Sequence, residues 1–291
     1  MSEARSPSGS TATVLRMILG KRLKVLREEA GLSEKDAAGL LHVNFLTVRR
    51  MERAETAFKI PYIAALLDAY GVGAQEKKEF LELAEQSNRP GWWHRFKEVL
   101  PDWFTAYVNL ESDATTLRVY EPTYVTGLLQ TRGYARALLR TGFPHDDEET
   151  LEHRVDLRLQ RQSLLEKPDA PTLWVVMSEA ALRTQVGGKE VMREQMDHLL
   201  ETTSRLRNVS VDVVPFSAGP HSGAFGPFTY FRFEAVELPD VVYLESAVGG
   251  VYYEQRADVE GHLEAHNEMS LLTSTATSEN LLVTTRKELY E

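Results

Sequence analysis

The sequence predicts a multidomain protein in which an all-α domain of five short helices, residues 14–88, precedes an α+β domain, residues 90–291. The first observation is a succession of short segments with helical hydrophobic spacing before residue 88. The second is a break at "SNRPGWWHR", residues 87–95, where Asn, Pro and Gly interrupt the helical pattern. The third is a group of β-branched and alternating segments after Pro171, which favour strands.

The first helix is expected over residues 14–30, with Gly31 at the position typical of a helix C-terminus. Ser33, with Asp36 three residues later, is a capping-box variant that opens a second helix to about Leu41. The apolar residues of the first helix lie near one face, although Leu23 comes one position late; they are Val14, Ile18, Leu23, Leu26 and Ala30.

A tight connection, His42-Val43-Asn44, leads to the third helix over residues 45–54, with Asn44 as its N-cap. Pro61 suits the first turn of a fourth helix that ends near residue 70. A fifth helix is expected over "AQEKKEFLELAEQ", residues 74–86. These segments complete the predicted helical domain.

The second domain is expected to mix helices with strands. Helices are predicted at residues 93–118, 131–165, 189–203 and 257–273, with a loop at "EPTYVTGLLQT". A hairpin around a Gly-Gly turn is expected in "VVYLESAVGGVYYE". The other predicted strands lie in "TLWVVMSEA", "NVSVDVVPF" and "FGPFTYFRFE". This pattern predicts an α+β fold without internal repeats.

The composition is that of a soluble globular protein, with 43% hydrophobic and 26% charged residues. No apolar run reaches the roughly 18 residues of a membrane span, so no membrane association is expected. Residues 1–13 are polar, lack the apolar centre of a signal peptide and are predicted to form a disordered tail. The chain has no cysteine, which fits a cytoplasmic protein and excludes disulfides.

Charge is distributed unevenly along the chain. Residues 1–60 carry 11 Lys+Arg against 7 Asp+Glu, a net charge of +4, whereas the whole chain has a net charge of -10. The remainder therefore sums to -14. An acidic body repels nucleic acid, so a basic patch on the first domain is the expected place for any contact with it.

The second and third helices have the arrangement of a DNA-binding helix-turn-helix, whose second helix enters the major groove. Val48 and Met51 are expected to face inward, where the small Ala37 and Ala38 permit close packing. Arginines alone would also fit a solvated surface, but the complete motif favours DNA binding. The outward face is predicted to present Phe45, Leu46, Arg49, Arg50 and Arg53.

The segment "LREEAGLSEKDAAGLLHVNFLTVRRMERAE" resembles the Xre family of helix-turn-helix repressors. The resemblance implies that Asn44 caps the recognition helix. It also implies an ion pair between Arg27 and Glu52 that ties the first helix to the third. The positions that often face bases in the family are occupied by Phe45, Leu46, Arg49 and Arg50.

The sequence departs from the Xre pattern in four places. His42 stands where a glycine is common in the turn, and Ala54 replaces the usual C-terminal glycine. Glu34 lies where the second helix often contacts phosphate, which weakens the expected affinity for the DNA backbone. Phe45 and Leu46 are apolar where polar residues are common. They could contact thymine methyl groups, or pack against the other domain.

From Trp92 onward the chain resembles the uncharacterised C-terminal domain that follows an Xre module in many actinobacterial regulators. That family is regarded as toxin–antitoxin-like, and its genes often neighbour one for a small partner protein. The resemblance implies a regulator that binds DNA and, as an open alternative, that partner. The segments that carry it are "GWWHRFKEVLPDWFTAYVNLESDATTLRVYEP", "VTGLLQTRGYARALL", "RLQRQSLL", "GGKEVMREQMDHLLE" and "VSVDVVPFSAGPHSGAFGPF".

Several features of the second domain could suggest chemistry, but each favours a structural interpretation. His262 and His266 lie four residues apart without a third ligand at metal-site spacing. No nucleophile-elbow sequence surrounds Ser178, which with Glu179 and His221 could be imagined in a catalytic triad. The acids of "PHDDEE" are expected to cap a helix. The Gly-rich "AGPHSGAFGPF" lacks the ending of a phosphate loop and is expected to be a turn, with a ligand lid as the alternative.

Two apolar groups are assigned first to the core and second to ligand or partner binding. The helical part of "VTGLLQTRGYARALL", residues 125–139, is expected to pack inward, with partner docking as the alternative. The aromatic residues near the domain junction are expected to form a core there, with a ligand pocket or partner groove as the alternative. These residues are Trp92, Trp93, Phe96, Trp103, Phe104 and Tyr107.

Together these patterns predict a cytoplasmic, sequence-specific transcriptional regulator that binds double-stranded DNA as a homodimer. The second domain is expected to mediate dimerisation, effector sensing or partner binding. Neither catalytic residues nor a metal or cofactor are assigned, and an antitoxin-like interaction protein remains the alternative. The predicted DNA-binding residues are Asn44, Phe45, Leu46, Thr47, Arg49, Arg50 and Arg53, with Lys21, Arg22 and Lys24 as candidate phosphate contacts.

Overall fold

The structure, a computed structural model, describes residues 12–88, 92–234, 239–246 and 249–290. The chain divides into two compact units, Met1–His94 and Arg95–Glu291, called here the first and second units. Most of the predicted tail, residues 1–11, lies outside the described residues. Residues 12 and 13, also assigned to that tail, belong instead to the first helix.

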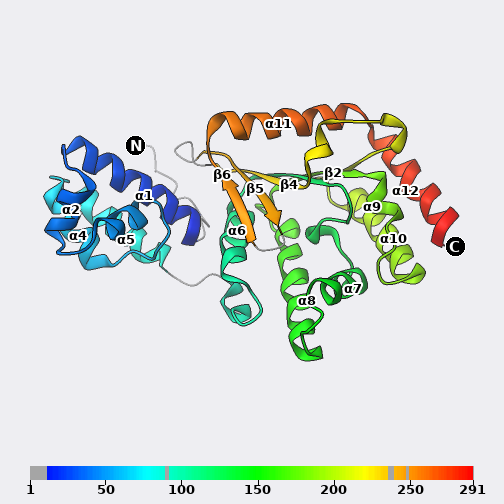
Figure 1. Ribbon diagram of the computed structural model, residues 1–291, viewed down its shortest axis with the longest axis horizontal. Helices are drawn as coiled ribbons and strands as arrows, with labels where there is room; N and C mark the ends of the chain where they lie inside the picture. The colour runs from blue at the N-terminus through cyan, green and yellow to red at the C-terminus, as the bar shows by residue number, and fades with distance from the viewer. Residues whose placement is uncertain (1–11, 89–91, 235–238, 247–248, 291) are drawn as a thin grey trace. The chain divides into compact units, whose positions relative to one another are not determined.

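The described part of the first unit is helical, as the sequence predicts (Figure 1). Its helices are α1 (Ala12–Glu29), α2 (Glu34–Leu40), α3 (Phe45–Glu52), α4 (Ile60–Ala69) and α5 (Ala74–Ser87). The side chain of Ser33 accepts a hydrogen bond from the Asp36 amide, and the Asp36 carboxylate accepts one from the Ser33 amide. This capping box fixes where α2 begins.

The core of the first unit lies among all five helices, and α1 contributes one continuous apolar face to it. The face is Leu15, Leu19, Leu23 and Leu26. The predicted face was therefore wrong in part, because Ile18 is only half-buried and Ala30 is exposed. Leu23 comes one position late in the predicted face because it belongs to the buried face that begins at Leu15.

The second unit contains a sheet and helices. The strands are β1 (Thr116–Glu121), β2 (Thr172–Ser178), β3 (Val209–Val214), β4 (Phe228–Arg232), β5 (Val241–Ser246) and β6 (Gly249–Tyr253). The α-helices are α6 (Asp102–Asp113), α7 (Arg132–Gly142), α8 (Glu148–Gln162), α9 (Glu179–Arg183), α10 (Lys189–Arg205), α11 (Arg256–Leu271) and α12 (Thr275–Tyr290). Short 3-10 helices are η1 (Trp92–Phe96), at the division between the units, η2 (Gly127–Leu129), η3 (Ser163–Glu166), η4 (Phe216–Ala218) and η5 (Ser222–Phe225).

The sheet has the strand order β3-β2-β1-β4-β5-β6. The first three strands in sequence are parallel, because α7 with α8, and then α9 with α10, cross over between them. The remaining strands are antiparallel, and β4 pairs with β1. The second unit is thus a mixed sheet with helices, which confirms the predicted α+β class.

Helices cover both faces of this sheet (Figure 1). α11 runs across one face, over a core that includes Tyr120, Tyr230 and Val242. α6 and α8 lie on the other side, where the Tyr107 ring meets Phe231 and Tyr243 edge-on at 5.4 and 4.8 Å between ring centroids. Side chains of successive strand residues therefore alternate between two helical layers.

Three predictions for the second unit were wrong in detail. The helix expected over residues 131–165 is instead α7, α8 and η3, with a break between Gly142 and Glu148. The helix expected over residues 93–118 is instead η1, α6 and the start of β1, which the sequence analysis missed. The predicted Gly-Gly turn is displaced, because Gly249 and Gly250 pair with β5 as the first residues of β6. A Cβ on Gly250 would lie 2.0 Å from the Tyr243 ring, so that glycine serves close packing. Helix α12 was not predicted.

Among the described residues, no helix combines the length and the apolar character that a membrane span requires.

Candidate nucleic-acid interface

α2 and α3 form a helix-turn-helix whose ends are fixed by side chains. The Asn44 side chain accepts a hydrogen bond from the Leu46 amide at 2.9 Å, so Asn44 caps α3 as expected. Val48 and Met51 turn inward and are almost fully buried, and Ala37 and Ala38 are buried on the facing helix. The opposite face of α3 is thereby held away from the core.

The turn and the end of α3 use left-handed backbone at residues that are not glycine. His42 has φ +52° and Ala54 has φ +59°. At each position two backbone hydrogen bonds form a Schellman motif. At His42 the donors are the His42 and Val43 amides, and the acceptors are the Gly39 and Ala38 carbonyl groups respectively. These are the two positions where the Xre pattern has glycine, so the departures carry a backbone cost.

Arg27 and Glu52, the pair implied by the resemblance, form a buried bidentate ion pair between α1 and α3. Arg27 donates from Nε and Nη2 to the Glu52 carboxylate at 2.6 and 2.9 Å, and from Nη1 to the Leu32 carbonyl at 2.8 Å. Both residues are 6% exposed. Removing one partner of such a pair typically costs about 3–5 kcal/mol because the other charge stays buried.

α1 also approaches α3 through a glycine. A Cβ on Gly20 would lie 2.6 Å from the Glu52 carbonyl oxygen and 2.9 Å from that of Met51. Both neighbours are backbone atoms, so they cannot rotate away. Gly20 could not be predicted from the sequence as a contact, because a glycine within a helix carries no signal of what packs on it.

The outward face of α3 presents both apolar and basic groups. Leu46 is 43% exposed, and Arg50 and Arg53 are exposed. Thr47 is half-buried. Phe45 was predicted to face outward, but it is partly buried and packs against the core of its own unit.

Arg49 is held by Glu34 at the start of α2. Its Nε lies 3.1 and 3.0 Å from the two carboxylate oxygens, and its Nη2 lies 2.6 Å from Oε2. This hydrogen bonding lowers the pKa of Glu34 and raises that of Arg49, so both remain charged at neutral pH. The guanidinium also lies 5.3 Å from the centroid of the Phe45 ring. The sequence predicts a position near phosphate for Glu34, but the pair with Arg49 was not predicted.

Arg50 differs from its neighbours in α3. Arg53 lies 4.0 Å from the Glu55 carboxylate, and Arg49 is paired with Glu34. Within the described part of the chain, no ion pair or hydrogen bond involves the Arg50 guanidinium. Arg50 is therefore the arginine of α3 most readily available to a ligand.

The predicted phosphate contacts on α1 are partly engaged within the first unit. Arg22 pairs with Glu76 of α5 at 2.7 Å, and Lys24 lies 3.8 Å from Glu28. Lys21 is half-buried. Lys35 on the first turn of α2 is exposed and was missed by the sequence analysis. In the sequence, only its position beside Glu34 indicated that Lys35 could contact phosphate.

The residues of the second unit that could suggest a catalytic triad form hydrogen bonds that stabilise the fold. The Ser178 hydroxyl accepts a hydrogen bond from the Ala180 amide and caps α9, while Glu179 accepts one from the Phe216 amide. His221 Nδ1 accepts one from the Gly223 amide. The described residues contain no group of three or more acidic, His or Cys side chains placed to hold a metal ion.

The acids of "PHDDEE" cap a helix as predicted, whereas the predicted aromatic core is confirmed only in part, because Trp92, Trp93 and Phe104 are half-buried. Asp147 caps α8 by accepting a hydrogen bond from the Thr150 amide at 2.8 Å. Tyr107 is buried and stacks on Phe104 with ring centroids 4.8 Å apart. Phe96 is also buried. The side chain of Trp103 lies outside the described residues.

Comparison with protein families assigns both units. Residues 104–280, from α6 to α12, match a family described as a domain of unknown function, DUF5753. The chain belongs to this family. Residues 18–80 match a helix-turn-helix domain, which confirms the helix-turn-helix part of the predicted resemblance. Comparisons with curated proteins and with solved structures give no match.

Proposed function

We propose that this DUF5753 family member is a sequence-specific DNA-binding transcriptional regulator. The observation that carries the proposal is the exposed basic face of α3, on a helix-turn-helix matched by a family of such domains. Arg50 at its centre has no ion pair among the described residues. A helix presented in this way fits the major groove, where arginine recognises guanine.

The outward residues divide into base contacts and phosphate contacts. Arg49 and Arg50 are the proposed guanine contacts, each contributing about 1–3 kcal/mol of discrimination. Leu46 is placed to contact a thymine methyl group, and Thr47 and Arg53 flank it. Phe45, which packs on the core, would support Arg49 rather than contact a base. The phosphate contacts are proposed to be Lys21, Arg22, Lys24 and Lys35.

One module of this size contacts few base pairs, so we propose that the chain binds a palindromic site as a homodimer. The half-sites would then lie about 34 Å apart, which is one turn of the duplex. The second unit is proposed to mediate dimerisation, effector sensing or partner binding in the cytoplasm.

A second candidate function is an antitoxin-like interaction protein. The second unit favours it by charge, because residues 95–291 carry 19 Lys+Arg against 31 Asp+Glu. Such a surface attracts a basic partner and speeds its association. The proposed partner is a small protein encoded by the neighbouring gene. Co-purification of the two products at several concentrations tests this candidate, and two independent species argue against it.

The DNA-binding proposal is tested with the full chain. Genomic fragments retained at physiological salt supply a site, and binding to it is then measured for R49A/R50A and for R256A. Arg256 is a matched control because it is 91% exposed at its side chain but lies in the second unit. We expect the double variant to lose site-specific retention with an unchanged circular dichroism spectrum, and R256A to bind normally. Equal retention of specific and random DNA by all three proteins would contradict the proposal.

A further inference from the structure

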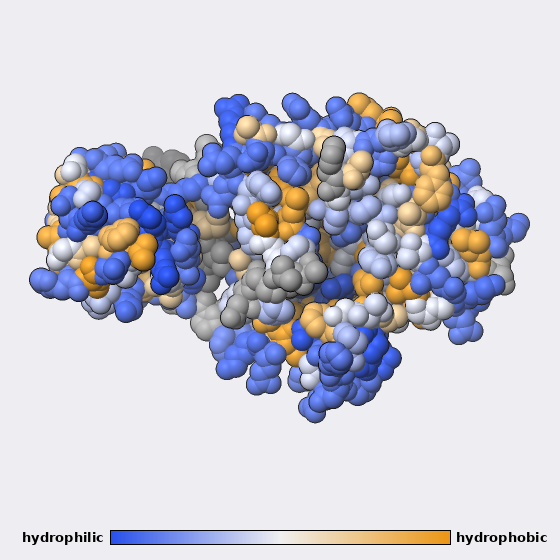
Figure 2. Space-filling model, viewed as in Figure 1, coloured by the Kyte–Doolittle hydropathy of each residue, from blue (hydrophilic) through white to orange (hydrophobic). Residues whose placement is uncertain are grey.

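The second unit contains a cleft of about 520 Å³ on the α6–α8 side of the sheet. Its volume lies within the range of roughly 300–1,000 Å³ that is usual for small-molecule sites. An adjoining hollow of about 340 Å³ shares part of the lining, including Arg158, Arg161 and Glu245. Figure 2 shows hydrophobic side chains at the surface between α6 and α8 on the viewed face.

The register of the sheet brings two acidic side chains to this cleft. Val119 pairs with Thr229, and Thr229 pairs with Tyr243, so these three residues share one row and one face. Glu121 and Glu245 lie two residues further along β1 and β5, and therefore project from the same face. With β4 between them, their Cα atoms are roughly 10 Å apart, at about 4.8 Å for each strand. Both line the cleft.

Helix α8 supplies the positive charges of the cleft. Arg161 is committed to Glu111 of α6 by a buried bidentate pair, with distances of 2.7 and 2.6 Å. Arg158 donates to the Gln130 side chain at 2.9 Å. Burial lowers the pKa of Arg158 to about 10, which still leaves it charged at neutral pH.

The charges of the cleft do not balance. Arg161 and Glu111 neutralise each other, and Arg154 on the rim pairs with Asp146 at 2.6 Å. Among the described residues that line the cleft, Arg158 then remains as one cation for the two carboxylates of Glu121 and Glu245. Burial, and next the charge of Glu245, raise the pKa of Glu121 to about 8. Glu121 is therefore mostly protonated at neutral pH, because no positive charge of the lining neutralises its carboxylate.

The rest of the lining is suited to an apolar body. Phe104 and Tyr107 stack on each other on one wall, with the Tyr243 ring edge-on to Tyr107. Leu139 and Phe143 of the α7 region form another part of the wall. Apolar walls with a few convergent charged groups are the usual composition of a ligand site.

We propose that this cleft binds a small organic cation, in which a primary ammonium or amidinium group lies between Glu121 and Glu245 and an aromatic or apolar body lies against Phe104, Leu139 and Phe143. The cation takes the place of the proton on Glu121 and satisfies both carboxylates. This inference specifies one role proposed above for the second unit, effector sensing, and in that sense rests on the proposed function.

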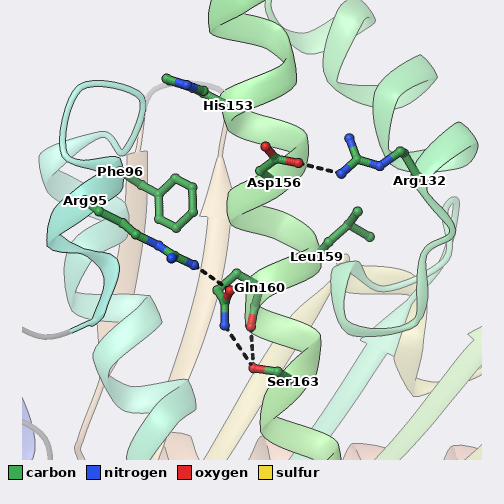
Figure 3. A pocket seen from close by; sticks show the side chains of 8 residues that line it. All are labelled: Arg95, Phe96, Arg132, His153, Asp156, Leu159, Gln160 and Ser163. Carbon is green, nitrogen blue, oxygen red and sulfur yellow. Dashed lines mark hydrogen bonds and ion pairs between the residues drawn. The ribbon is translucent and has the colours of Figure 1, made fainter.

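A hollow elsewhere on α8 lacks these properties. The pocket in Figure 3 has about 560 Å³ and is lined by residues of η1, α7, α8 and η3. Arg132 pairs with Asp156, and Arg95 donates to the Gln160 side chain. Asp156, the carboxylate of this lining, is thus already paired with Arg132, and Arg95 adds a positive charge, so the pocket does not suit a cation.

The test is isothermal titration of the full chain without DNA, so that its failure is separate from a failure of DNA binding. The probes are 2-phenylethylamine, tryptamine and benzamidine, with phenylacetate and 2-phenylethanol as anionic and neutral counterparts. We expect at least one cation to bind with Kd below about 1 mM, and both counterparts to bind at least about tenfold more weakly. Near pH 7.5, buffers with different ionisation enthalpies should show that binding releases protons.

The variants separate a ligand contact from a structural role. E121Q and E245Q should each weaken binding of the cation at least about tenfold, and E121Q should abolish the proton release. E268Q removes one exposed carboxylate on α11 and should bind normally. The proposal is overturned if none of the three cations binds below about 1 mM, if phenylacetate binds as well as they do, or if E121Q and E245Q match E268Q.

Discussion

The Glu34 carboxylate holds the Arg49 guanidinium through both of its oxygens, between the start of α2 and the middle of α3. This pairing uses the Nε–H and one Nη2–H of Arg49, so the Nη1–H groups and the second Nη2–H remain for a guanine edge. Glu34 therefore fixes the orientation of Arg49, while its own charge repels the phosphates near α2. Arg50, in contrast, keeps all of its donors for a ligand within the described part of the chain.

Replacement of Glu34 by Gln should raise the affinity for DNA, because the variant keeps the shape of the side chain and removes a charge that repels the phosphates. We expect a several-fold lower Kd for the selected site and for random DNA, measured by fluorescence anisotropy over a series of salt concentrations. E29Q is the control, since Glu29 is an exposed acid at the end of α1. If E34Q and E29Q bind alike, the charge of Glu34 does not limit the affinity for DNA.

The helix ends of the first unit provide a matched set of backbone substitutions. His42 and Ala54 adopt left-handed backbone without being glycine, whereas Gly31 and Gly71 adopt it as glycine in the same kind of cap. H42G and A54G should each stabilise the protein by about 0.5–1 kcal/mol, because the left-handed cost outweighs the added freedom of the unfolded chain. Urea unfolding followed by circular dichroism measures the change.

The converse substitutions are G31A and G71A. A Cβ at either glycine meets nothing within 4 Å, so only the backbone conformation opposes alanine. Each should lose about 1 kcal/mol. Opposite signs for the two pairs would establish the left-handed cost, while a loss of stability in H42G would show that the His42 side chain contributes more than its backbone costs.

Local signals in the sequence were enough to predict the first unit. Asn44 and the Ser33–Asp36 box mark helix starts through contacts within three residues, so they can be recognised without a tertiary structure. The Arg49–Glu34 pair joins residues 15 positions apart on two helices, and its formation depends on how those helices cross. The buried face of α1 was predicted wrongly for a similar reason. Two overlapping sets of residues in this helix are apolar, and the choice between them depends on how the helix packs.

The second unit shows where local signals fail. β1 follows α6 after only two residues, so its alternation was absorbed into the helical pattern. α12 is rich in Thr and Ser, which do not favour helices, and it packs on α10 and β3. The cleft was not foreseen because Glu121 and Glu245 are brought together by pairing with β4. The aromatic group near it was assigned to the core first and to a ligand pocket second.

Replacement of Gly20 by Ala tests the close approach of α1 to α3. The added Cβ would lie 2.6 Å from the Glu52 carbonyl oxygen, so the two helices must separate. We expect a loss of about 1–3 kcal/mol in the free energy of unfolding, as for other overpacked sites. The control is G39A, because Gly39 is also helical but has open space around it, and alanine there should stabilise α2. Equal effects of G20A and G39A in urea unfolding would refute the contact.

His266 on α11 gives the fold a dependence on pH that can be isolated. The ring is fully buried, its Nε2 lies 3.3 Å from the Trp174 carbonyl oxygen, and its Nδ1 has no hydrogen-bond partner among the described residues. Burial, together with the nearby positive charge of Arg118, lowers the pKa of His266 to about 4. The folded protein therefore holds the neutral imidazole.

In the unfolded chain histidine titrates near pH 6.5, so between about pH 6.5 and pH 4 the unfolded state binds the additional proton. Stability from this residue is complete above pH 6.5 and decreases as the pH falls. From about pH 7.5 to pH 4.5 the loss should be about 2–3 kcal/mol. H266Q should lower stability at pH 7.5 but lack this part of the decrease, whereas H262Q, at a partly exposed position one turn earlier, should retain it. Urea midpoints at both pH values measure the difference, and parallel decreases in H266Q and H262Q would mean that His266 is not the group responsible.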